Sequence, residues 1–409
     1  MSGPIVCVVG LGYIGLPTAT VLASRGAQVI GLDVNERAVA TINAGGVHIV
    51  EPGLDALVAG VVAQGRLRAT TVAEPADAFL IAVPTPFKGD HAPDLAYVEA
   101  AARAIAPVLA KGNCVILEST SPVGATEKMA GWIAEARPDL APGDLAIAYC
   151  PERVLPGNVI HELVANDRVI GGLTPNCAAC ATAIYRIFVE GECIETDART
   201  AELTKLTENS FRDVNIAFAN ELSLICDKLK IDVWELIALA NRHPRVNILQ
   251  PGPGVGGHCI AVDPWFIVDS APEQAKLIRQ ARMVNDAKPQ WVIDQVAAAI
   301  AATGKPRATV ACLGLAFKAN IDDLRESPAL EIAAALARRD DAHVLAVEPN
   351  IDALPAVLAE TAELAEAADA VARADVIVVL VDHAPFRDID RAALAGKAVI
   401  DTRGLLPRA

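Results

Sequence analysis

The chain has 409 residues, 53% of them hydrophobic, which is enough for two or three domains with full cores. Its formal net charge of −15 argues against non-specific binding to nucleic acid, and an anionic substrate would need a local cationic pocket. No apolar run reaches the roughly 18 residues of a membrane helix. No signal-peptide pattern follows the N-terminus, and the nine cysteines are scattered and odd in number, so we expect a cytoplasmic protein with reduced thiols.

Short apolar runs alternate with helical patterns over the first 150 residues. Strands are predicted at residues 5–9, 28–32, 78–83, 114–118 and 145–149, and helices at 96–109 and 127–136. Alternation of this kind predicts an α/β fold with a parallel sheet that is covered on both faces. Ligands of such folds bind at the carboxyl ends of the strands.

A dinucleotide-binding fingerprint follows the first strand. Gly10, Gly12 and Gly15 form Gly-x-Gly-x-x-Gly at the start of a helix, and Asp33 ends the next strand. The glycines allow a tight turn, close approach of a pyrophosphate and close helix packing, while the helix N-terminus faces the phosphates. Asp33 should accept the ribose hydroxyls, which favours NAD over NADP. A glycine turn that binds nothing is the alternative.

One long helix is predicted for residues 200–229, and at 1.5 Å per residue it would span about 45 Å. A helix of this length would link two domains and pack against a partner subunit. A short helix is expected at 233–241 and a helical pair within 273–296.

Three polar side chains share one face of the long helix. Lys205, Asn209 and Arg212 stand at positions i, i+4 and i+7. An ordinary solvated face would give the same pattern. Because Phe211, Val214 and Phe218 flank the stripe, we expect part of this helix to be buried. A lysine in such a setting has a lowered pKa. We therefore expect Lys205 to exchange protons.

A second α/β pattern begins near residue 309. Strands are predicted at 310–313, 344–347, 376–380 and 399–400, with a helix at Pro328–Ala337. The chain is therefore predicted to have two doubly wound Rossmann-like lobes joined by a helical middle domain. The expected boundaries are 1–198 for an NAD-binding domain, 199–300 for a central dimerisation domain and 301–409 for a substrate-binding domain.

One thiol stands in a glycine-rich turn, in the sequence Gly256-Gly257-His258-Cys259, with Asp263 four residues further on. Most free cysteines are small buried hydrophobes. Next to two glycines and an acid, however, Cys259 is predicted to act as a nucleophile that holds an aldehyde. A thiol and a nicotinamide site together suggest two successive oxidations, from alcohol to aldehyde and then to acid.

Cys177 and Cys180 also form a Cys-x-x-Cys sequence, but no second pair follows and their surroundings are rich in alanine. We interpret this spacing as that of a helix, and we predict no metal site.

Charged residues follow several predicted strands. Residues 118–122 and the pair Glu152 and Arg153 lie at strand ends, where Glu152 could orient water and Arg153 could bind an anion. Both could equally be partners in loop salt bridges.

Further cations lie close to the predicted site. Lys318 and Arg325 follow the first strand of the second lobe and are candidates for phosphate or carboxylate contacts, although a charged surface loop is the alternative. His243 and Arg245 precede the thiol turn and could reach a substrate. His243 alone is more often a packed or capping histidine.

Over nearly its whole length the chain resembles the UDP-glucose/GDP-mannose dehydrogenase family. The resemblance is carried by residues 10–16, 81–86, 118–124, 149–157, 205–221, 241–266 and 317–328. Loops 151–157, 241–247 and 254–263 resemble the branch that oxidises UDP-N-acetyl-D-mannosamine. Val262 stands where enzymes for UDP-glucose typically have lysine.

The resemblance implies an NAD-dependent, four-electron oxidation of the sugar C6 hydroxyl through a thiohemiacetal and a thioester on Cys259. It implies that Lys205 is the proton shuttle and oxyanion partner and Asp263 the base for water. Asn209 and Thr120 would hold the reacting oxygen or the water. The implied substrate contacts are Arg153, Val154, Lys205, Asn209, Arg212, His243, Arg245, Gly256 and Lys318, and the implied NAD contacts are Tyr13, Ile14, Thr85, Thr126 and Arg325 with the glycines and Asp33.

The family pattern also implies a homodimer through the long central helix, in which the neighbouring subunit could supply His243, Arg245 and Arg325. Arg403 stands where the pattern predicts lysine, so its charge is kept but its hydrogen-bond geometry is not. Two alternatives stay open: the same chemistry on UDP-N-acetylglucosamine or UDP-glucose, and a non-catalytic NAD-binding regulator.

Overall fold

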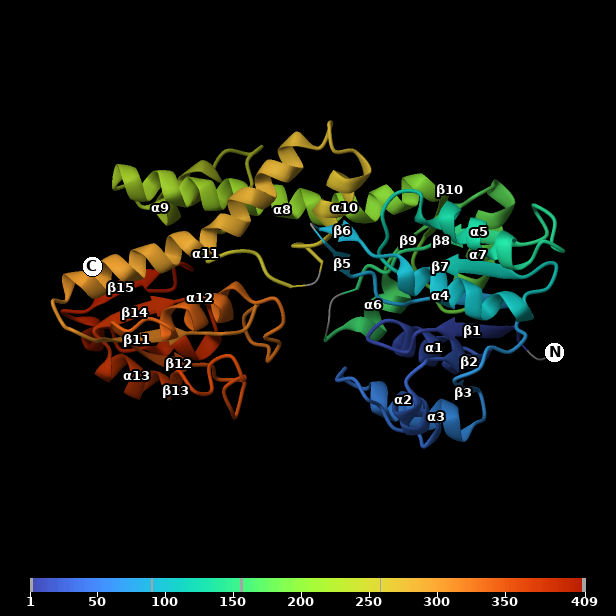
Figure 1. Cartoon of the computed structure of the whole chain (residues 1–409), viewed down its shortest axis with the longest axis horizontal. Helices are drawn as coiled ribbons and strands as arrows, with labels where there is room; N and C mark the ends of the chain where they lie inside the picture. Colours follow the sequence, from blue (N-terminus) through green and yellow to red (C-terminus); the bar gives the residue numbers. More distant parts are fainter. Residues whose placement is uncertain (1–2, 90, 155–156, 258, 407–409) are drawn as a thin grey trace. The chain divides into compact units, whose positions relative to one another are not determined.

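The computed structural model describes residues 3–89, 91–154, 157–257 and 259–406. The chain folds into two compact units, one of residues 1–208 with 269–272 and the other of residues 209–268 with 273–409 (Figure 1). Within the described ranges, no helix combines the length and the hydropathy that are needed to cross a membrane.

The first unit is built on an eight-stranded sheet with the order β10-β9-β8-β7-β4-β1-β2-β3. Its strands are β1 (Ile5–Val9), β2 (Gln28–Leu32), β3 (Leu67–Thr70), β4 (Ala78–Ile81), β7 (Cys114–Leu117), β8 (Ala146–Tyr149), β9 (Arg168–Gly172) and β10 (Cys193–Asp197), with a separate hairpin of β5 (Phe87–Lys88) and β6 (Ala92–Pro93). Its helices are α1 (Gly15–Ser24), α2 (Glu36–Asn43), α3 (Leu54–Ala63), α4 (Ala96–Ile105), α5 (Ala125–Ala136), α6 (Val159–Ala165) and α7 (Pro175–Tyr185), with a 3-10 turn at Ala106–Val108.

Helices cover both faces of this sheet because successive strand side chains point to opposite sides. Val6 and Val8 of β1 lie in the core cluster that includes residues of α1, α3, α6 and α7. Cys7 and Val9 lie in the opposite cluster, with residues of α4 and α5. The doubly wound arrangement predicted from the alternating pattern is therefore confirmed.

The sheet is not parallel throughout, which corrects the sequence-based expectation. β9 runs antiparallel to β8, and β10 runs parallel to β9. The edge strands β3 and β10 were not predicted from the sequence, because their apolar patterns are weak. In β3 and β10 several side chains are exposed, because these strands form the two edges of the sheet.

The long helix α8 (Ala198–Leu229) passes from the first unit into the second, and α9 (Val233–Ala240), α10 (Asp263–Ser270) and α11 (Lys276–Ala302) follow it. The expected pair of helices within 273–296 is wrong. A single helix, α11, runs through this segment with Pro289 buried inside it.

The second unit contains a five-stranded, wholly parallel sheet with the order β13-β12-β11-β14-β15. Its remaining elements are β11 (Ala308–Leu313), α12 (Pro328–Ala337), β12 (Ala342–Val347), β13 (Ala362–Leu364), α13 (Ala367–Arg373), β14 (Val376–Val379) and β15 (Ala398–Asp401), with 3-10 turns at Ala384–Asp388 and Arg391–Leu394. Core clusters on both faces of the sheet again show a doubly wound lobe, as predicted.

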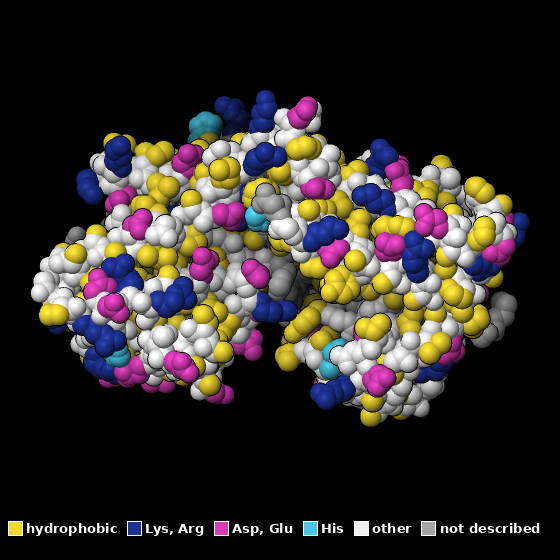
Figure 2. Space-filling model, viewed as in Figure 1, with side chains coloured by type: hydrophobic (Ala, Val, Ile, Leu, Met, Phe, Trp, Pro, Cys, Tyr) yellow, Lys and Arg dark blue, Asp and Glu magenta, His cyan; other side chains and the backbone are white. Residues whose placement is uncertain are grey.

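The charged side chains do not segregate on the face shown in Figure 2. Lys and Arg are interspersed with Asp and Glu in both units. The distribution of charge on this face therefore does not by itself identify a cationic binding surface.

Candidate active site

The glycine turn after β1 leaves open space in front of its main chain. Gly10 has a φ of +89°, and a Cβ added there would lie 2.7 Å from the carbonyl oxygen of Ala82. A Cβ on Gly15 would lie 1.7 Å from the oxygen of Gly10, whereas one on Gly12 would meet nothing within 4 Å. Two of the glycines therefore serve close packing, while Gly12 leaves room for a pyrophosphate at the N-terminus of α1.

Asp33 is held beside this turn, at the carboxyl end of β2. One carboxylate oxygen accepts the N–H of Leu11 at 2.7 Å and the other accepts the N–H of Asn35 at 2.8 Å. Tyr13 and Ile14 precede α1, and Tyr13 is 49% exposed. A half-buried carboxylate fixed at this position fits the ribose of a dinucleotide.

The loops after β4 and β7 are tied together at the same edge of the sheet. The hydroxyl of Thr85 donates to the carbonyl of Thr120 at 2.5 Å, and the hydroxyl of Ser119 donates to the carbonyl of Val83 at 2.6 Å. These bonds hold the predicted cofactor contact Thr85 next to the predicted catalytic residue Thr120.

Thr126 faces away from solvent. It is fully buried at the start of α5, and its hydroxyl donates to Glu202 of α8 at 2.6 Å. Glu202 also accepts the N–H groups of Gly124 and Thr126, at 2.6 and 2.8 Å. In this structure Thr126 thus joins α5 to α8, and its predicted contact with NAD stays a prediction.

Lys205 and Glu152 interact electrostatically in the first unit. Lys205 lies one turn after Glu202 on α8 and is 8% exposed. Burial raises the pKa of Glu152 to about 7, although the nearby positive charges of Lys205 and Arg168 act to lower it. Glu152 also accepts the N–H of Val154. A carboxyl group with this pKa can take up and release a proton at neutral pH.

Arg153 is engaged by acceptors within the first unit. Its guanidinium lies 2.6 Å from a carboxylate oxygen of Glu208 and donates to the carbonyl of Asp167 at 3.3 Å. Its side chain is 31% exposed. The next part of the predicted substrate loop, residues 155 and 156, lies outside the described residues.

A buried polar cluster near Glu152, made of Glu118, Tyr185 and Arg168, was not predicted from the sequence. Glu118, 1% exposed, accepts the hydroxyl of Tyr185 at 3.1 Å, and the guanidinium of Arg168 lies 5.7 Å from the centre of the Tyr185 ring. Burial raises the pKa of Glu118 to about 7, and the positive charge of Arg168 opposes this. The pairing of Leu117 with Tyr149 places Glu118 and Glu152 at the same sheet edge.

The second unit brings three predicted catalytic residues together. The side-chain amide of Asn209 donates to a carboxylate oxygen of Asp263 at 2.5 Å, and Asp263 is 2% exposed. The N–H of Asp263, the first residue of α10, donates to the carbonyl of Cys259 at 2.9 Å. The thiol residue and the carboxylate are therefore linked by one helical turn.

Cys259 differs from the other thiols in its exposure. All nine cysteines lie in the described parts of the chain, and of these only Cys259 is exposed. Burial raises the pKa of Cys7, Cys114, Cys150 and Cys312 to about 12, so these thiols are poor nucleophiles.

The thiol turn rests on the loop that carries Lys318. A Cβ on Gly256 would lie 2.5 Å from the carbonyl oxygen of Glu326 and 3.0 Å from the Cβ of Phe317. Gly257, with a φ of +86°, donates its N–H to the same Glu326 oxygen at 3.3 Å. Glycine is needed at both positions because any side chain would push the two loops apart.

The remaining predicted cations lie at the surface of the second unit. Lys318 is exposed, and Arg325 donates two hydrogen bonds to Asp323, at 2.8 and 2.6 Å. His243 and Arg245 are exposed, and the ring Nδ1 of His243 accepts the N–H of Arg245 at 3.3 Å.

Part of α8 is buried as expected, since Lys205 is 8% exposed, but the flanking phenylalanines from which this was inferred are not. Phe211 is 69% exposed and Phe218 is 52% exposed, and Arg212 is exposed as well. The buried side of this part of the helix carries polar residues, among them Asp213 and Asn220.

These two buried residues belong to a network that the sequence did not reveal. Asp213 accepts a 2.5 Å hydrogen bond from Arg282 of α11, and the amide of Asn285 donates to the same oxygen at 2.8 Å. Asn220 donates to Asn285 at 2.9 Å and accepts the N–H of Gly252, also at 2.9 Å. The network thereby anchors the segment that leads to the thiol turn.

Among the residues that the structure describes, no group of three or more His, Cys, Asp and Glu side chains could hold a metal ion. Cys177 and Cys180 lie on α7, which confirms the helical interpretation of their spacing.

The chain matches the three domains of one protein family. Residues 5–189 match its NAD binding domain, residues 199–287 its central domain and residues 311–408 its UDP binding domain. The chain belongs to the UDP-glucose/GDP-mannose dehydrogenase family. The predicted resemblance and the NAD cofactor are thus confirmed, and Gly12, Asp33 and α1 provide a fitting place for that cofactor.

Several relatives align with this chain over nearly its full length. It is 64% identical over 418 residues to UDP-N-acetyl-D-mannosamine dehydrogenase of Salmonella typhi, covering 99% of this chain and 100% of that protein. It is 63% identical over 407 residues to NDP-N-acetyl-D-galactosaminuronic acid dehydrogenase of Ralstonia nicotianae, covering 98% and 96%. The solved UDP-D-ManNAc dehydrogenase of Pyrococcus horikoshii superimposes with a TM-score of 0.88 at 39% identity, covering 99% of this chain and 96% of that one.

Proposed function

We propose that the protein oxidises the C6 hydroxyl of UDP-N-acetyl-D-mannosamine to the carboxylate, giving UDP-N-acetyl-D-mannosaminuronate. The observation that carries this proposal is the exposed thiol of Cys259, one helical turn from the buried Asp263–Asn209 pair, in a chain with NAD binding and UDP binding domains. An oxidation that stopped at the aldehyde would need no such thiol.

NAD supplies the oxidant: two molecules each accept one hydride, and one alcohol and one water yield one carboxylate and three protons. The thiolate of Cys259 bonds to the aldehyde carbon, whose oxygen takes up a proton to give a thiohemiacetal. After the second oxidation the carbon is held as a thioester. Water then adds to the thioester, the carbon–sulfur bond breaks, and the thiol is restored.

The proton transfers are assigned to the titratable groups around this chemistry. Lys205 accepts the proton of the C6 hydroxyl and stabilises the developing oxyanion. Asp263 is the base for water, oriented by the amide of Asn209. Glu152, whose pKa is raised by burial to about 7, orients water, and Thr120 holds the water or the reacting oxygen.

The binding contacts are assigned from the resemblance of the chain to the family pattern. The proposed substrate contacts are Arg153, Val154, Lys205, Asn209, Arg212, His243, Arg245, Gly256 and Lys318, and the proposed NAD contacts are Gly10, Gly12, Tyr13, Ile14, Gly15, Asp33, Thr85, Thr126 and Arg325. We assign residues 1–198 to NAD binding, 199–300 to dimerisation and 301–409 to binding of the UDP-sugar.

The identity of the sugar is the most specific part of the proposal. The relatives from Salmonella typhi and Ralstonia nicotianae have nearly equal identity to this chain, yet their names specify N-acetylmannosamine and N-acetylgalactosamine derivatives. Mannosamine is favoured by loops 151–157 and 241–247 and by the Pyrococcus horikoshii structure. N-acetylgalactosamine is the second candidate because of the Ralstonia relative.

Initial rates with UDP-N-acetylmannosamine, UDP-N-acetylgalactosamine, UDP-N-acetylglucosamine and UDP-glucose test the proposal. We expect the highest kcat/KM for UDP-N-acetylmannosamine. A higher kcat/KM for any of the other three would replace the sugar, and no NADH formation with any of them would contradict the function.

The protein is further proposed to be a cytoplasmic homodimer that pairs through α8. An apolar stripe is exposed along this helix, at a spacing that keeps its members on one face. Its members are Leu203, Phe211, Phe218, Ile225 and Leu229, with exposed fractions of 43, 69, 52, 47 and 61%. A second copy of the chain would remove this surface from water.

A further inference from the structure

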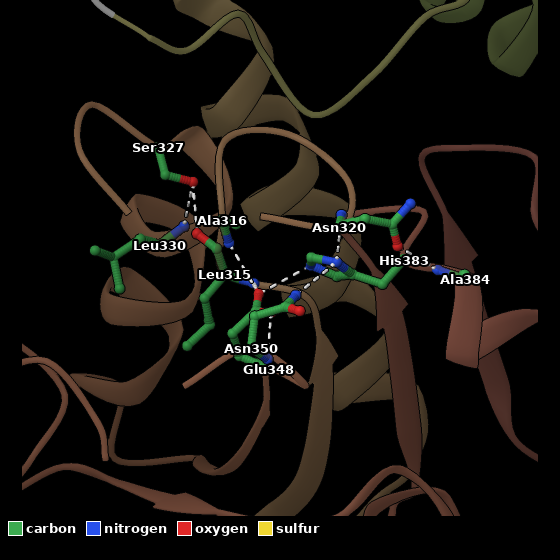
Figure 3. Close-up of polar contacts among 9 residues, drawn as sticks. All are labelled: Leu315, Ala316, Asn320, Ser327, Leu330, Glu348, Asn350, His383 and Ala384. Atoms are coloured by element: carbon green, nitrogen blue, oxygen red, sulfur yellow. Dashed lines mark hydrogen bonds and ion pairs between the residues drawn. The ribbon is translucent and has the colours of Figure 1, made fainter. Parts of the chain in front are cut away.

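A buried carboxylate and a buried imidazole meet at the carboxyl ends of three neighbouring strands in the second unit (Figure 3). Glu348 follows β12 and His383 follows β14, and both side chains are fully buried. One oxygen of Glu348 accepts the N–H groups of Leu315 and Ala316, at 2.8 and 3.0 Å, and lies 2.9 Å from Nε2 of His383. Three donors thus converge on a single oxygen atom.

The contacts of His383 define which ring nitrogen carries the proton. Its Nδ1 accepts the main-chain N–H of Asn320 at 2.9 Å and lies 3.2 Å from the amide nitrogen of Asn350. Because a main-chain N–H can only donate, Nδ1 has no hydrogen, and Nε2–H therefore donates to Glu348. Glu348 also accepts the side-chain amide of Asn350 at 2.9 Å. The pair is a carboxylate and a neutral imidazole in a fully hydrogen-bonded site.

These contacts fix both ends of the loop that carries Lys318. Leu315 donates its N–H to Glu348, and its carbonyl accepts the hydroxyl of Ser327 at 2.6 Å. At the other end, Asn320 has a φ of +61°, which is uncommon for a residue other than glycine, and its side chain accepts the N–H of Ala384 at 2.9 Å. The backbone from 315 to 320 is therefore held on both sides of Lys318.

The first unit contains a similar turn after its first strand, but the acidic residue at that turn, Asp33, has a different environment from Glu348. Leu11 donates to Asp33 at 2.7 Å, as Leu315 donates to Glu348 at 2.8 Å, and in both units the acid follows the second strand of its lobe. Asp33 is half-buried, and such a carboxylate binds the ribose in dinucleotide-binding lobes. Glu348 instead is fully buried and accepts a hydrogen bond from Nε2–H of His383. The acid of the second lobe thus faces the protein interior.

We propose that Glu348 and His383 are positioning residues for the UDP-sugar: the pair holds loop 315–320 so that Lys318 is presented to the diphosphate and Phe317 supports the thiol turn. This inference rests on the proposed function and deepens it. Burial alone would raise the pKa of Glu348, but the hydrogen bonds from His383, Leu315 and Ala316 outweigh it and lower the pKa to about 2. The carboxylate therefore remains charged at every pH at which the enzyme is expected to work.

Calorimetric titration with UDP tests the inference without turnover. For His383→Ala and Glu348→Gln we expect the Kd of UDP to rise by about tenfold, the factor expected when one charge-assisted contact is no longer held in place. The Kd of NAD should change much less than that of UDP, because the proposed NAD contacts other than Arg325 belong to the first unit. His383→Gln, whose amide can both accept and donate, should recover part of the UDP affinity.

His343→Ala is the matched control. This histidine also faces a glutamate, Glu363, at 3.4 Å on the same sheet, but both side chains are partly exposed, and in the described residues neither is hydrogen-bonded to loop 315–320. We expect it to bind UDP as the wild type does. Because UDP binding is measured directly, a failure of the wild type to oxidise the sugar would refute the proposed function and leave this test intact.

Two results would overturn the inference. One is a wild-type Kd for UDP in folded His383→Ala and Glu348→Gln. The other is an equal loss of UDP and NAD affinity, which would indicate a general loss of structure. If His383→Ala does not fold, the isosteric Glu348→Gln decides between the same outcomes.

Discussion

Replacement of Glu118 by glutamine should change how the stability of the protein depends on pH. Burial raises the pKa of this carboxyl from 4.5 to about 7, against the opposing charge of Arg168. The folded state therefore binds the proton more tightly than the unfolded state does. The resulting stabilisation is complete below pH 4.5 and is lost as the pH rises through 7.

The size of this effect follows from the two pKa values. At about 1.4 kcal/mol per pH unit, the difference between 4.5 and about 7 amounts to about 3 kcal/mol, of which about 2 to 3 kcal/mol lies between pH 5 and pH 8. Glutamine mimics the protonated acid and does not titrate. Its neutral amide also leaves Arg168 without a counter-charge, but that cost is the same at every pH, because arginine stays protonated.

Equilibrium urea unfolding of wild type and Glu118→Gln at pH 5, 6, 7 and 8 measures the effect. We expect the variant to gain about 2 to 3 kcal/mol relative to the wild type between pH 5 and pH 8. Glu195→Gln, on the exposed edge strand β10, is the control and should show a constant difference. A difference for Glu118→Gln that is equally constant would refute the argument that burial controls this carboxyl.

Three further outcomes follow from the structure. Because burial raises the pKa of Glu152 to about 7, we expect the pH profile of kcat to have an inflection near pH 7. This inflection should vanish in Glu152→Gln, and an unchanged profile would assign it to another group. Arg282→Met leaves the fully buried Asp213 without its charged partner, so it should lower the free energy of unfolding by about 3 to 5 kcal/mol. Urea titrations measure this, and a loss below about 1 kcal/mol would contradict it. Phe218→Glu should shift the protein to monomers in analytical ultracentrifugation, because it puts a charge into the exposed stripe of α8; a dimer of unchanged affinity would exclude that face.

Local sequence was enough to predict the parts of the site that neighbouring residues determine. The glycine turn and Asp33 need only a strand, a helix and a second strand in order, and the structure has all three. Cys259 and Asp263 are four residues apart, so one helical hydrogen bond connects them. The wholly buried strands were predicted because they form continuous apolar runs.

Long-range contacts could not be predicted, because they depend on strand order and on how helices pack. Glu118 and Tyr185 are 67 positions apart, and Glu348 and His383 are 35 apart. The antiparallel pairing of β9 with β8 could not be predicted from the apolar pattern of β9, because a buried strand has the same pattern in either direction. A sequence signal for the buried polar cluster was a charged residue, Arg168, at the start of the otherwise apolar strand β9.

The exposed phenylalanines of α8 show a second limit of sequence analysis. Phe211 and Phe218 have the spacing of a buried helix face, yet within one chain they are exposed. Periodicity reports that a face is apolar, but not whether the chain itself or a second copy covers it.

The yield of NADH per molecule of UDP-N-acetyl-D-mannosamine consumed, measured together with the product, tests the role of Cys259 most directly. The wild type should form two NADH and one uronate, and Cys259→Ser should form no uronate while it still binds NAD in a fluorescence titration. A wild-type yield of one NADH with free aldehyde, or undiminished uronate formation by Cys259→Ser, would contradict the thioester route.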